Sequence, residues 1–502
     1  MSNEYALETR SLTKTFPGVV AVNEVDFAVR PGEVHALLGE NGAGKSTFCK
    51  VLSGVHRPTS GEVLIDGEPV TFRSPHDALL SGLSMVYQER NLIPFLTGAQ
   101  NICLGMEATR CGSLIHEAET RRTARKIRDR VGARVRLDVP VSTLRPSEQQ
   151  VIEILRALFH RPRLLLLDEP TASLTHQDTE MLYEVIQNVL AERVGVIFIS
   201  HKLEEVLRIA DRITVFRDGV RVITAEAEHF DRDVCIRHMT NRDISELYPD
   251  VHAEPSDELL LEVSHVSDGG KLHDVSFSLA PGEVVGFYGL VGSGRTELAE
   301  LLFGLTPRVA GNVKLRGDEI RIANPGDAID HGIFLVPEDR ARHGLFPAFN
   351  LMENLTLPVI SRFLGKLGLI NHRAEAAAAV QIADNEELRL VYTDIQQAVD
   401  SLSGGNKQKI LIARWLSKRE DAAVIILDEP TQGIDIGVKH EIYELLRRLA
   451  EEHQLGVIFI SSELAEVIGV SDRVCVFKEG TIAKEFHRKE IESQEQILEW
   501  AF

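Results

Sequence analysis

The sequence of 502 residues has few cysteines, and these five, Cys49, Cys103, Cys111, Cys235 and Cys475, are widely scattered. They form no Cys-x-x-Cys pair and no Cys/His cluster, which argues against a zinc site or a disulfide framework. The sequence also lacks any run of 18 uncharged apolar residues, and its start, MSNEYALETR, has no apolar signal segment. We therefore expect a protein of a reducing compartment that is not exported and does not span a membrane by itself.

Positive charge is scarce as well, because 55 Lys and Arg stand against 75 Asp and Glu, for a net charge of -20. Most of such a surface repels a phosphate backbone, so we expect no nucleic-acid partner. Hydrophobic residues at 44% and charged residues at 26% are close to the averages of soluble globular chains, which excludes disorder, collagen and coiled coil as the main architecture. The length exceeds what one hydrophobic core usually organises, which predicts two or more domains.

An internal repeat organises the chain. Pro31-Gly32-Glu33-Val34 returns as Pro281-Gly282-Glu283-Val284, LLLLDEPT (164–171) returns as VIILDEPT (424–431), and residues 195–219 return at 456–480 with fourteen of twenty-five positions identical. One period of about half the chain indicates a tandem duplication. We place the domains at 1–245 and 259–502, joined by a polar, acidic linker at 246–258.

Each half has the pattern of an α/β domain. Apolar, β-branched runs such as VGVIFIS and AAVIILD alternate with helical patterns such as HKLEEVLRIADR. This alternation predicts strands of a mostly parallel sheet covered by helices. The middle of each half, about 90–160 and 340–417, lacks strand signals, which predicts a separate helical subdomain.

One part of the first such region, residues 120–136, has eight basic residues. Contact with anionic lipid or with a partner is one interpretation of this stretch. We favour a solvated helix face, which is the commoner origin of such a charge run.

The first half contains a phosphate-binding loop. Gly39-Glu40-Asn41-Gly42-Ala43-Gly44-Lys45-Ser46 fits G-x-x-x-x-G-K-S, follows the strand pattern VHALL and precedes a helical pattern. In such a loop, backbone N–H groups surround the phosphates, Lys45 meets the β and γ oxygens, and Ser46 offers a hydroxyl to Mg2+. We predict that residues 39–46 and Thr47 bind ATP; a plain glycine turn is the alternative.

A carboxylate pair follows the buried strand pattern Leu164 to Leu167. Strand ends of parallel sheets are where ligands bind. Asp168 is suited to hold Mg2+, and Glu169 is suited to orient and deprotonate an attacking water. The alternative for Glu169 is a cap on the following helix.

These motifs, with Gln88 in VYQER, His201 in FISH and LSGG at 402–405, resemble the ATP-binding cassette (ABC) superfamily over nearly the whole chain. The resemblance implies two P-loop nucleotide-binding domains, each with a RecA-like α/β core, an antiparallel β subdomain and a helical subdomain. It implies that Gln88 contacts Mg2+ and senses a membrane partner, that His201 is a γ-phosphate switch and that Phe16 stacks on adenine. A core aromatic and a helix cap are the alternatives for Phe16 and His201.

Cassettes of this superfamily pair head to tail, which implies two composite ATP sites. Site one combines Lys45, Ser46, Gln88, Asp168, Glu169 and His201 with Ser403, Gly404 and Gly405 of the other half. Site two uses the loop Gly289-Leu290-Val291-Gly292-Ser293-Gly294-Arg295-Thr296, in which Arg295 replaces lysine. Glu338 and Ser462 replace the glutamine and histidine, and Arg145-Pro146-Ser147 replaces Ser-Gly-Gly, although Asp428 and Glu429 remain. These four departures predict one hydrolysing site.

A consensus cassette fused to a degenerate one resembles the ATPases of monosaccharide importers, as do VPEDRARHGL and LSGGNKQK in the second half. The first signature departs from that family because it lacks even one glycine. The resemblance implies a peripheral subunit on the cytoplasmic face of the membrane, with two copies of a permease and a periplasmic or lipid-anchored sugar-binding protein. Importers of nucleosides or of a sugar-like signalling molecule are an alternative, and a soluble ribosome-associated tandem cassette is a further one.

Overall fold

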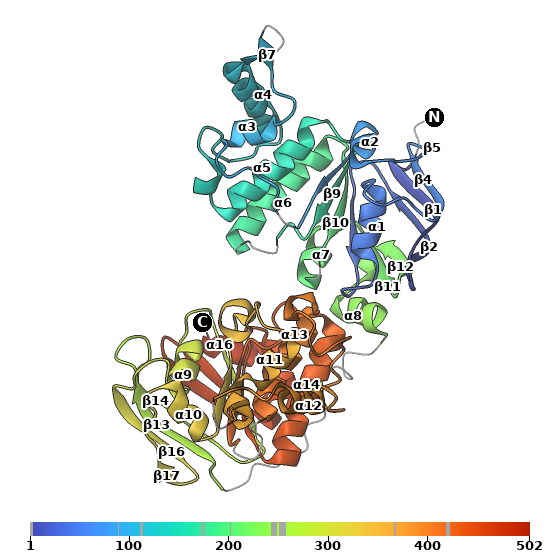
Figure 1. The fold of residues 1–502 in the computed structure, drawn as a ribbon. Coiled ribbons are helices and arrows are strands. Elements are labelled where there is room, and N and C mark those ends of the chain that lie inside the picture. Colours follow the sequence, from blue (N-terminus) through green and yellow to red (C-terminus); the bar gives the residue numbers. More distant parts are fainter. Residues whose placement is uncertain are drawn as a thin grey trace. The chain divides into compact units, whose positions relative to one another are not determined.

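The computed structural model describes residues 4–88, 90–110, 114–171, 174, 176–200, 202–241, 248–249, 258–365, 368–417 and 422–501. The chain divides into two units, residues 1–244 and 245–502 (Figure 1). Residues 246–247 and 250–257 of the expected linker lie outside the described residues. The linker boundaries therefore stay a prediction.

In the first unit, six described strands form a sheet. Neighbouring strands are parallel except for β11 and β12 at one edge, which are antiparallel. In spatial order the strands are β12 (Val220–Glu226), β11 (Arg212–Arg217), β3 (Val34–Leu38), β10 (Gly195–Ile199), β9 (Leu164–Asp168) and β6 (Leu83–Val86). A separate antiparallel sheet has the order β2 (Val19–Val29), β1 (Leu7–Phe16), β4 (Ser60–Ile65) and β5 (Glu68–Val70). The predicted α/β class is confirmed.

Helices cover both faces of this parallel sheet, as an all-buried strand such as β3 requires. Helix α1 lies on the side of the antiparallel sheet, and α5 and α6 lie on the other side (Figure 1). The described helices are α1 (Lys45–Leu52), α2 (Pro75–Leu80), α3 (Gly98–Ile102), α4 (Glu117–Arg130), α5 (Pro146–Phe159), α6 (His176–Ala191), α7 (Leu203–Ile209) and α8 (Arg232–Thr240).

The helical subdomain of the first unit consists of α3, α4 and the start of α5, as expected. It also has two very short strands, β7 (Thr109–Arg110) and β8 (Leu114–Ile115), where only helix was expected. Two residues are too few to produce a period-two pattern, so this hairpin had no signal in the sequence.

The basic stretch forms α4 and the segment that follows it. Its arginines pair with nearby acids, including Arg121 with Glu117 at 2.9 Å and Arg136 with Glu148 at 3.0 Å. These side chains are exposed and locally neutralised, which supports the interpretation as a solvated helix face.

The second unit repeats this architecture. Its mostly parallel sheet has the order β18 (Ile333–Val336), β19 (Val424–Asp428), β20 (Gly456–Ile460), β15 (Val284–Gly289), β21 (Arg473–Lys478) and β22 (Thr481–His487). Its antiparallel sheet has the order β14 (Val275–Leu279), β13 (Leu261–Ser267), β16 (Ala310–Leu315) and β17 (Asp318–Glu319). Two apolar clusters, one on each face of the parallel sheet, form the core of this unit.

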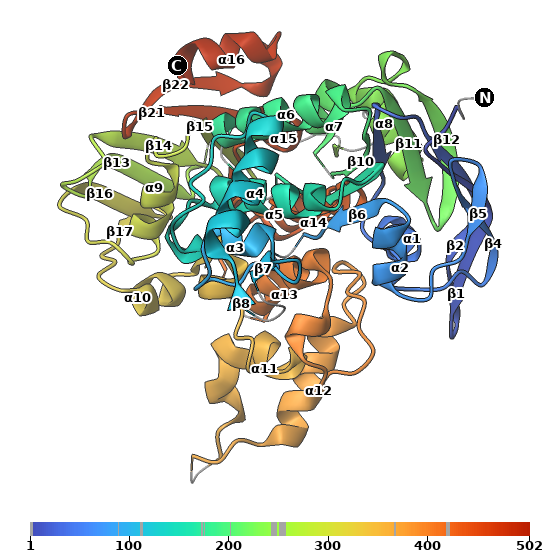
Figure 2. The same cartoon turned by 90° about the horizontal axis from the view of Figure 1, so that it is seen from above.

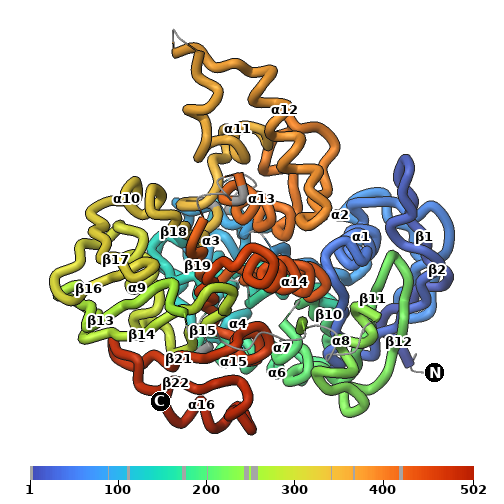
Figure 3. Tube along the Cα trace, turned by 90° about the horizontal axis from the view of Figure 1, so that it is seen from below, coloured from blue at the N-terminus to red at the C-terminus, as the bar shows by residue number. Residues whose placement is uncertain are grey.

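The described helices of the second unit are α9 (Arg295–Leu302), α10 (Pro325–Asp330), α11 (Leu351–Thr356), α12 (His372–Ala383), α13 (Gly404–Leu416), α14 (Ile436–His453), α15 (Leu464–Val470) and α16 (Gln494–Ala501). Figure 2 shows α11 and α12 as a lobe that extends away from the sheet, and Figure 3 shows the same lobe from the opposite side. This lobe is the expected helical subdomain. No helix in the described part of the chain has both the length and the apolar character that crossing a bilayer requires.

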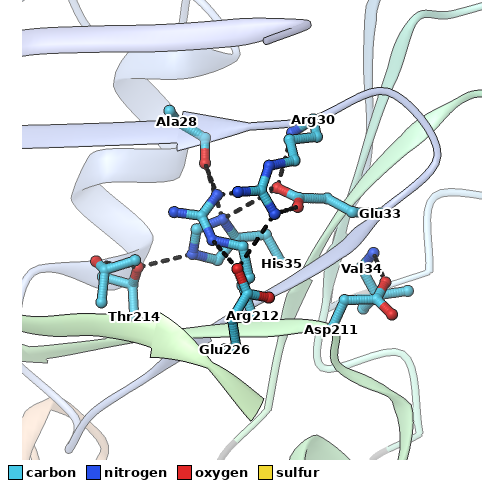
Figure 4. Close-up of polar contacts among 10 residues, drawn as sticks. Ala28, Arg30, Glu33, Val34, His35, Asp211, Arg212, Thr214 and Glu226 are labelled. Carbon is cyan, nitrogen blue, oxygen red and sulfur yellow. Dashed lines mark hydrogen bonds and ion pairs between the residues drawn. The ribbon is translucent and has the colours of Figure 1, made fainter. Parts of the chain in front are cut away.

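A buried polar cluster fixes β3, the strand that leads into the first phosphate loop (Figure 4). The imidazole of His35 is fully buried, and its Nδ1 lies 2.9 Å from the carbonyl oxygen of Ala28. Burial lowers the pKa of His35, so the neutral ring donates from Nδ1 and accepts at Nε2 from the Thr214 hydroxyl at 2.7 Å. Arg212 donates to Glu33 at 3.3 Å. These bonds tie β2, β3 and β11 together at the amino end of β3.

Candidate nucleotide-binding sites

The first phosphate loop connects β3 to α1. Gly44 has φ 98° just before Lys45 begins the helix, and a Cβ atom there would collide with the carbonyl oxygen of Ala21. Only glycine satisfies both requirements. The loop therefore has the conformation in which backbone N–H groups and the N-terminus of α1 can face an anion.

Lys45 closes this loop. Its side chain is 7% exposed, and Nζ donates to the carbonyl oxygens of Gly39 at 2.6 Å and Glu40 at 2.9 Å. Both acceptors belong to the loop itself. Ser46 is exposed beside Lys45 at the start of α1, and Thr47 follows it half-buried.

The carboxylate pair lies at the carboxyl end of β9. Burial, together with the neighbouring Glu169 charge, raises the pKa of Asp168, while Lys45 acts in the opposite direction. Glu169 has a left-handed φ of 46°, and its carboxylate accepts a hydrogen bond from Gln88 Nε2 at 2.9 Å. Because α6 begins only at His176, the alternative of Glu169 as a helix cap is wrong. A strained backbone at such a residue is typical of functional sites.

Of the other predicted residues, Phe16 ends β1 and is 38% exposed, so it is not a core aromatic. Its ring meets His56 edge-on at 5.3 Å between centroids, and Lys14 Nζ lies 5.0 Å from the ring centre. His201 lies outside the described residues. Its switch role and its helix-cap alternative stay predictions.

One residue beside the site was missed from the sequence. Glu205 on α7 accepts hydrogen bonds from Thr171 Oγ1 at 2.5 Å and from Ser200 Oγ at 3.0 Å. Thr171 follows Glu169 closely, and Ser200 is the residue that follows strand β10. Glu466 does the same in the second unit, with Thr431 at 2.6 Å and Ser461 at 2.8 Å. The glutamate that recurs in HKLEEV and SELAEV was the available signal.

The second loop differs at its cation. Arg295 stands in the loop sequence together with Gly289, Gly292, Gly294 and Thr296. Its guanidinium, however, makes its contacts outside the loop. Its Nη1 donates to the carbonyl oxygen of Ser461 at 2.7 Å and lies 3.6 Å from Glu429 Oε1. Arg295 is only 8% exposed. The side chain therefore joins α9 to the ends of β19 and β20.

The acids of the second site are crowded. Burial raises the pKa of Asp428 to about 7, and the charges of Glu429 and Glu338 act in the same direction. Burial also raises the pKa of Glu429, which accepts a hydrogen bond from Ser462 Oγ at 3.2 Å. Glu338 thus opposes ionisation of Asp428 and Glu429. In the first unit the equivalent residue, Gln88, instead donates a hydrogen bond to Glu169.

The two signature segments occupy equivalent places, each at the start of a helix. Ser403 is the N-cap of α13, where its Oγ accepts from Asn406 N at 3.3 Å. Gly405 packs against α14, and a Cβ there would collide with Val438. In the first unit Arg145 is the N-cap of α5, Pro146 is its first residue and Ser147 is buried.

The hairpin that holds Phe16 is also shorter in the second unit. Leu12 pairs with Val25 in the first unit, whereas Val266 pairs with Val275 in the second. The tip that presents Phe16 therefore has no equivalent in the described residues 261–279. This is a further difference between the two sites that the sequence repeat did not reveal.

Two phosphate loops, each opposite a strand that ends in a carboxylate pair, define a tandem nucleotide-hydrolysing ATPase. Residues 22–172 and 272–432 both match the family model described as ABC transporter, and the chain belongs to this family. The predicted resemblance is confirmed, and the chain is a nucleotide-binding ATPase coupled to transport.

Two named relatives extend over almost the whole chain. The ribose import ATP-binding protein RbsA 1 of Rubrobacter xylanophilus is 44% identical over 492 residues, covering 98% of this chain and 97% of that protein. The ribose import ATP-binding protein RbsA of Hahella chejuensis is 41% identical over 498 residues, covering 99% and 98%. A solved nucleotide-free ATP-binding cassette from an ABC transporter is 22% identical, covers 47% of this chain and 96% of its own, and has a TM-score of 0.42.

Proposed function

We propose that the chain is the ATP-hydrolysing subunit of an importer that takes up a monosaccharide. The relatives named as ribose import ATP-binding proteins match it over nearly their full length, which supports a sugar as the cargo. The subunit works on the cytoplasmic face of the membrane with two copies of a permease. A periplasmic or lipid-anchored sugar-binding protein delivers the cargo to that permease.

In this proposal one composite site hydrolyses ATP. The supporting observation is the different partners of the two loop cations. Lys45 donates to carbonyl oxygens of its own loop, those of Gly39 and Glu40, and a phosphate can take their place. Arg295 is held by Ser461 and by the carboxylate of Glu429, which offsets the positive charge that a phosphate requires.

Site one then works through side chains of the first unit. Glu169 takes the proton from the attacking water, and its hydrogen bond with Gln88 holds the carboxylate in place. Lys45 moves its charge from the loop carbonyls to the β and γ oxygens of ATP. Helix α1 points its N-terminus at the same phosphates.

A magnesium ion fits this donor set. Ser46, Gln88 and Asp168 offer a hydroxyl, an amide and a carboxylate, which are the oxygen ligands that Mg2+ prefers. Burial and the charge of Glu169 raise the pKa of Asp168, which supports a cation at this place, because a nearby cation favours the ionised carboxylate. When bound, Mg2+ neutralises charge on the β and γ phosphates.

The second unit completes site one with Ser403, Gly404 and Gly405. The Ser403 hydroxyl, the first backbone N–H groups of α13 and its N-terminal dipole all favour an anion. In site two the opposing segment is Arg145-Pro146-Ser147, in which proline removes one donor.

The decisive experiment compares Glu169→Gln with Glu429→Gln in the purified permease complex. We expect Glu169→Gln to lower ATP turnover by about 10^2 to 10^4, because it removes the base, and to leave ATP binding intact. Glu429→Gln should lower turnover far less. Near wild-type turnover of the Glu169→Gln complex would contradict the proposal.

The cargo needs a separate experiment. Proteoliposomes with the permease complex and the binding protein should accumulate a labelled monosaccharide in an ATP-dependent way. Uptake of nucleosides in place of sugars would move the proposal to the alternative cargo. Co-sedimentation of the chain with ribosomes, and not with its permease, would replace it by the soluble-factor alternative.

A further inference from the structure

Arg340 occupies an unusual place in the second unit. It begins a π-helical turn (η4, Arg340–Gly344) shortly after β18, two residues beyond Glu338. Its Nη1 donates to the carbonyl oxygen of Gly404 at 3.0 Å, and its Nη2 donates to the carbonyl oxygen of Gln432 at 2.7 Å. One guanidinium therefore joins two backbone segments that lie far apart in the sequence.

Each of these segments is functionally placed. Gly404 is the first residue of α13 and stands between Ser403 and Gly405. Gln432 lies in the turn that follows Glu429, and its side chain also donates to Glu338 at 3.5 Å. The segments line a cavity of about 450 Å3, together with Leu345, Pro347 and Lys407. Arg340 forms part of the same wall.

The guanidinium of Arg340 also lies close to two glycines of these segments. A Cβ on Gly404 would lie 3.6 Å from Arg340 Nη1, and a Cβ on Gly433 would lie 3.5 Å from Nη2. Burial lowers the pKa of Arg340, and no salt bridge of this side chain is found among the described residues. The planar fork is thus directed at two backbone carbonyls, a geometry that an ammonium group does not reproduce.

We propose that Arg340 is a positioning residue for site one. Its side chain holds the Ser403-Gly404-Gly405 segment in the orientation that ATP requires. Its second bond ties that segment to the turn after Glu429. The degenerate half of the chain thereby contributes to the geometry of the hydrolysing site. This inference rests on the proposed head-to-tail pairing of the two units.

The first unit contains a related contact at the same place in the repeat. Arg90, two residues after Gln88, donates to Gln149 Oε1 on α5 at 3.3 Å. There the arginine reaches a side chain of the helix, whereas Arg340 reaches the backbone of the signature itself. In both units an arginine at this position therefore contacts the helix that begins at the signature segment.

The test uses the full chain in its permease complex, with Arg340→Gln, Arg340→Lys and the control Arg342→Gln. Arg342 lies in the same turn, its side chain is 83% exposed and it pairs with Asp339. A positioning error of about 1 Å can lower turnover by about 10^2. We expect kcat to fall about 10- to 100-fold in Arg340→Gln, with a KM for ATP within about threefold of wild type, because the loop of the first unit is intact.

Arg340→Lys should recover little of this kcat, and Arg342→Gln should match wild type. Hydrogen exchange should become faster at residues 403–408 and 432–434 in both Arg340 variants, while β3 and α1 stay protected. If Arg340→Gln does not fold, Arg340→Lys decides the question by the same two measurements. Wild-type kcat in Arg340→Gln, full kcat in Arg340→Lys, or unchanged exchange at 403–408 would overturn the proposal.

A parallel measurement on Glu169→Gln distinguishes failure of the positioning role of Arg340 from failure of the proposed function. If Glu169→Gln is inactive while Arg340→Gln turns over normally, only the positioning role fails. If Glu169→Gln turns over normally, the proposed function itself fails.

Discussion

Arg295 donates a hydrogen bond of 2.7 Å to the carbonyl oxygen of Ser461, the residue that follows strand β20. The equivalent cation of the first unit, Lys45, bonds instead to its own loop. The arginine side chain is longer than that of lysine, and its guanidinium reaches the end of the neighbouring strand β20. Arg295 is thus a structural link between α9, β19 and β20, whereas Lys45 stays within its own loop.

Arg295→Lys should release this link. The lysine is too short to keep both Ser461 and Glu429, so its charge returns to the loop, and we expect nucleotide affinity of the second unit to rise several-fold, about 1 kcal/mol. ATP turnover should stay unchanged, because Glu338, Ser462 and the first signature are untouched. Titration of a fluorescent ATP analogue into Glu169→Gln chains, with and without Arg295→Lys, measures the effect.

The control for this titration is Arg321→Lys, an exposed arginine of the same unit. A nucleotide affinity that is equal in the Arg295→Lys and Arg321→Lys chains would contradict the role given to Arg295.

Asp428→Asn should stabilise the second unit at alkaline pH. Burial raises the pKa of Asp428 from its ordinary 3.8 to about 7, so between these values the folded state holds a proton that the unfolded chain has released. Stability therefore falls as pH rises through this window. Removing the charge should raise the free energy of unfolding at pH 8 by on the order of 4 kcal/mol at most, and by much less at pH 4.

Thermal unfolding of the chain without nucleotide or metal, at pH 4 and pH 8, checks this difference. Asp318→Asn, at an exposed strand position, serves as the matched variant. An Asp428→Asn chain that melts lower than wild type at pH 8 is the opposite of the expected result.

Glu205→Gln should affect both stability and turnover. The carboxylate accepts from Thr171 and Ser200, which flank Glu169 and position 201, and hydrogen bonds to a charged group contribute about 1.5–3 kcal/mol. We expect a lower melting temperature and a fall in kcat of about tenfold, since misplaced catalytic groups react more slowly.

Glu466→Gln is the matched change in the second unit, where the same two bonds are present along with a salt bridge to Lys439. It should lower stability at least as much as Glu205→Gln but reduce turnover less. Equal losses of turnover in both variants would show that this network does not distinguish the two sites.

The sequence predicted those parts of the structure that depend on local chemistry. The loop at Gly39 to Ser46 was recognisable because a left-handed glycine and a lysine at fixed spacing have few other uses. The hydrogen bond from Arg295 to Ser461 could not be predicted, because it joins residues 166 positions apart and depends on how β15 and β20 pair. The same holds for His35, whose neutral state follows from burial between β2 and β11.

Short strands, differences in hairpin length and contacts between distant residues also could not be predicted from the sequence. The hairpin of β7 and β8 has two residues in each strand, and the missing counterpart of Phe16 follows from a change in hairpin length. Glu205 and Glu466 do repeat in the sequence, but a repeated glutamate on a helix is usually a solvated one. Only the fold shows that each of them accepts from two hydroxyls in the segments that follow neighbouring strands.

The head-to-tail pairing itself is tested by Ser403→Arg. Ser403 begins α13 in the second unit, and the bulky cation would fill the place where site one requires a hydroxyl and close backbone donors. Lys45 and Glu169 stay unchanged in this variant. Oriented donors of this kind contribute about 10^2 to 10^3 in rate each, so we expect turnover in the permease complex to fall by about that factor.

The mirror variant changes Arg145-Pro146-Ser147 to Ser-Gly-Gly. It repairs one wall of site two but leaves Arg295 bound to Ser461 and leaves Glu338 beside Glu429, so we expect little gain in turnover. Steady-state ATPase rates of the two complexes measure both effects in one assay. A silent Ser403→Arg change, or a large gain from the repaired first signature, would show that hydrolysis does not reside in a single composite site.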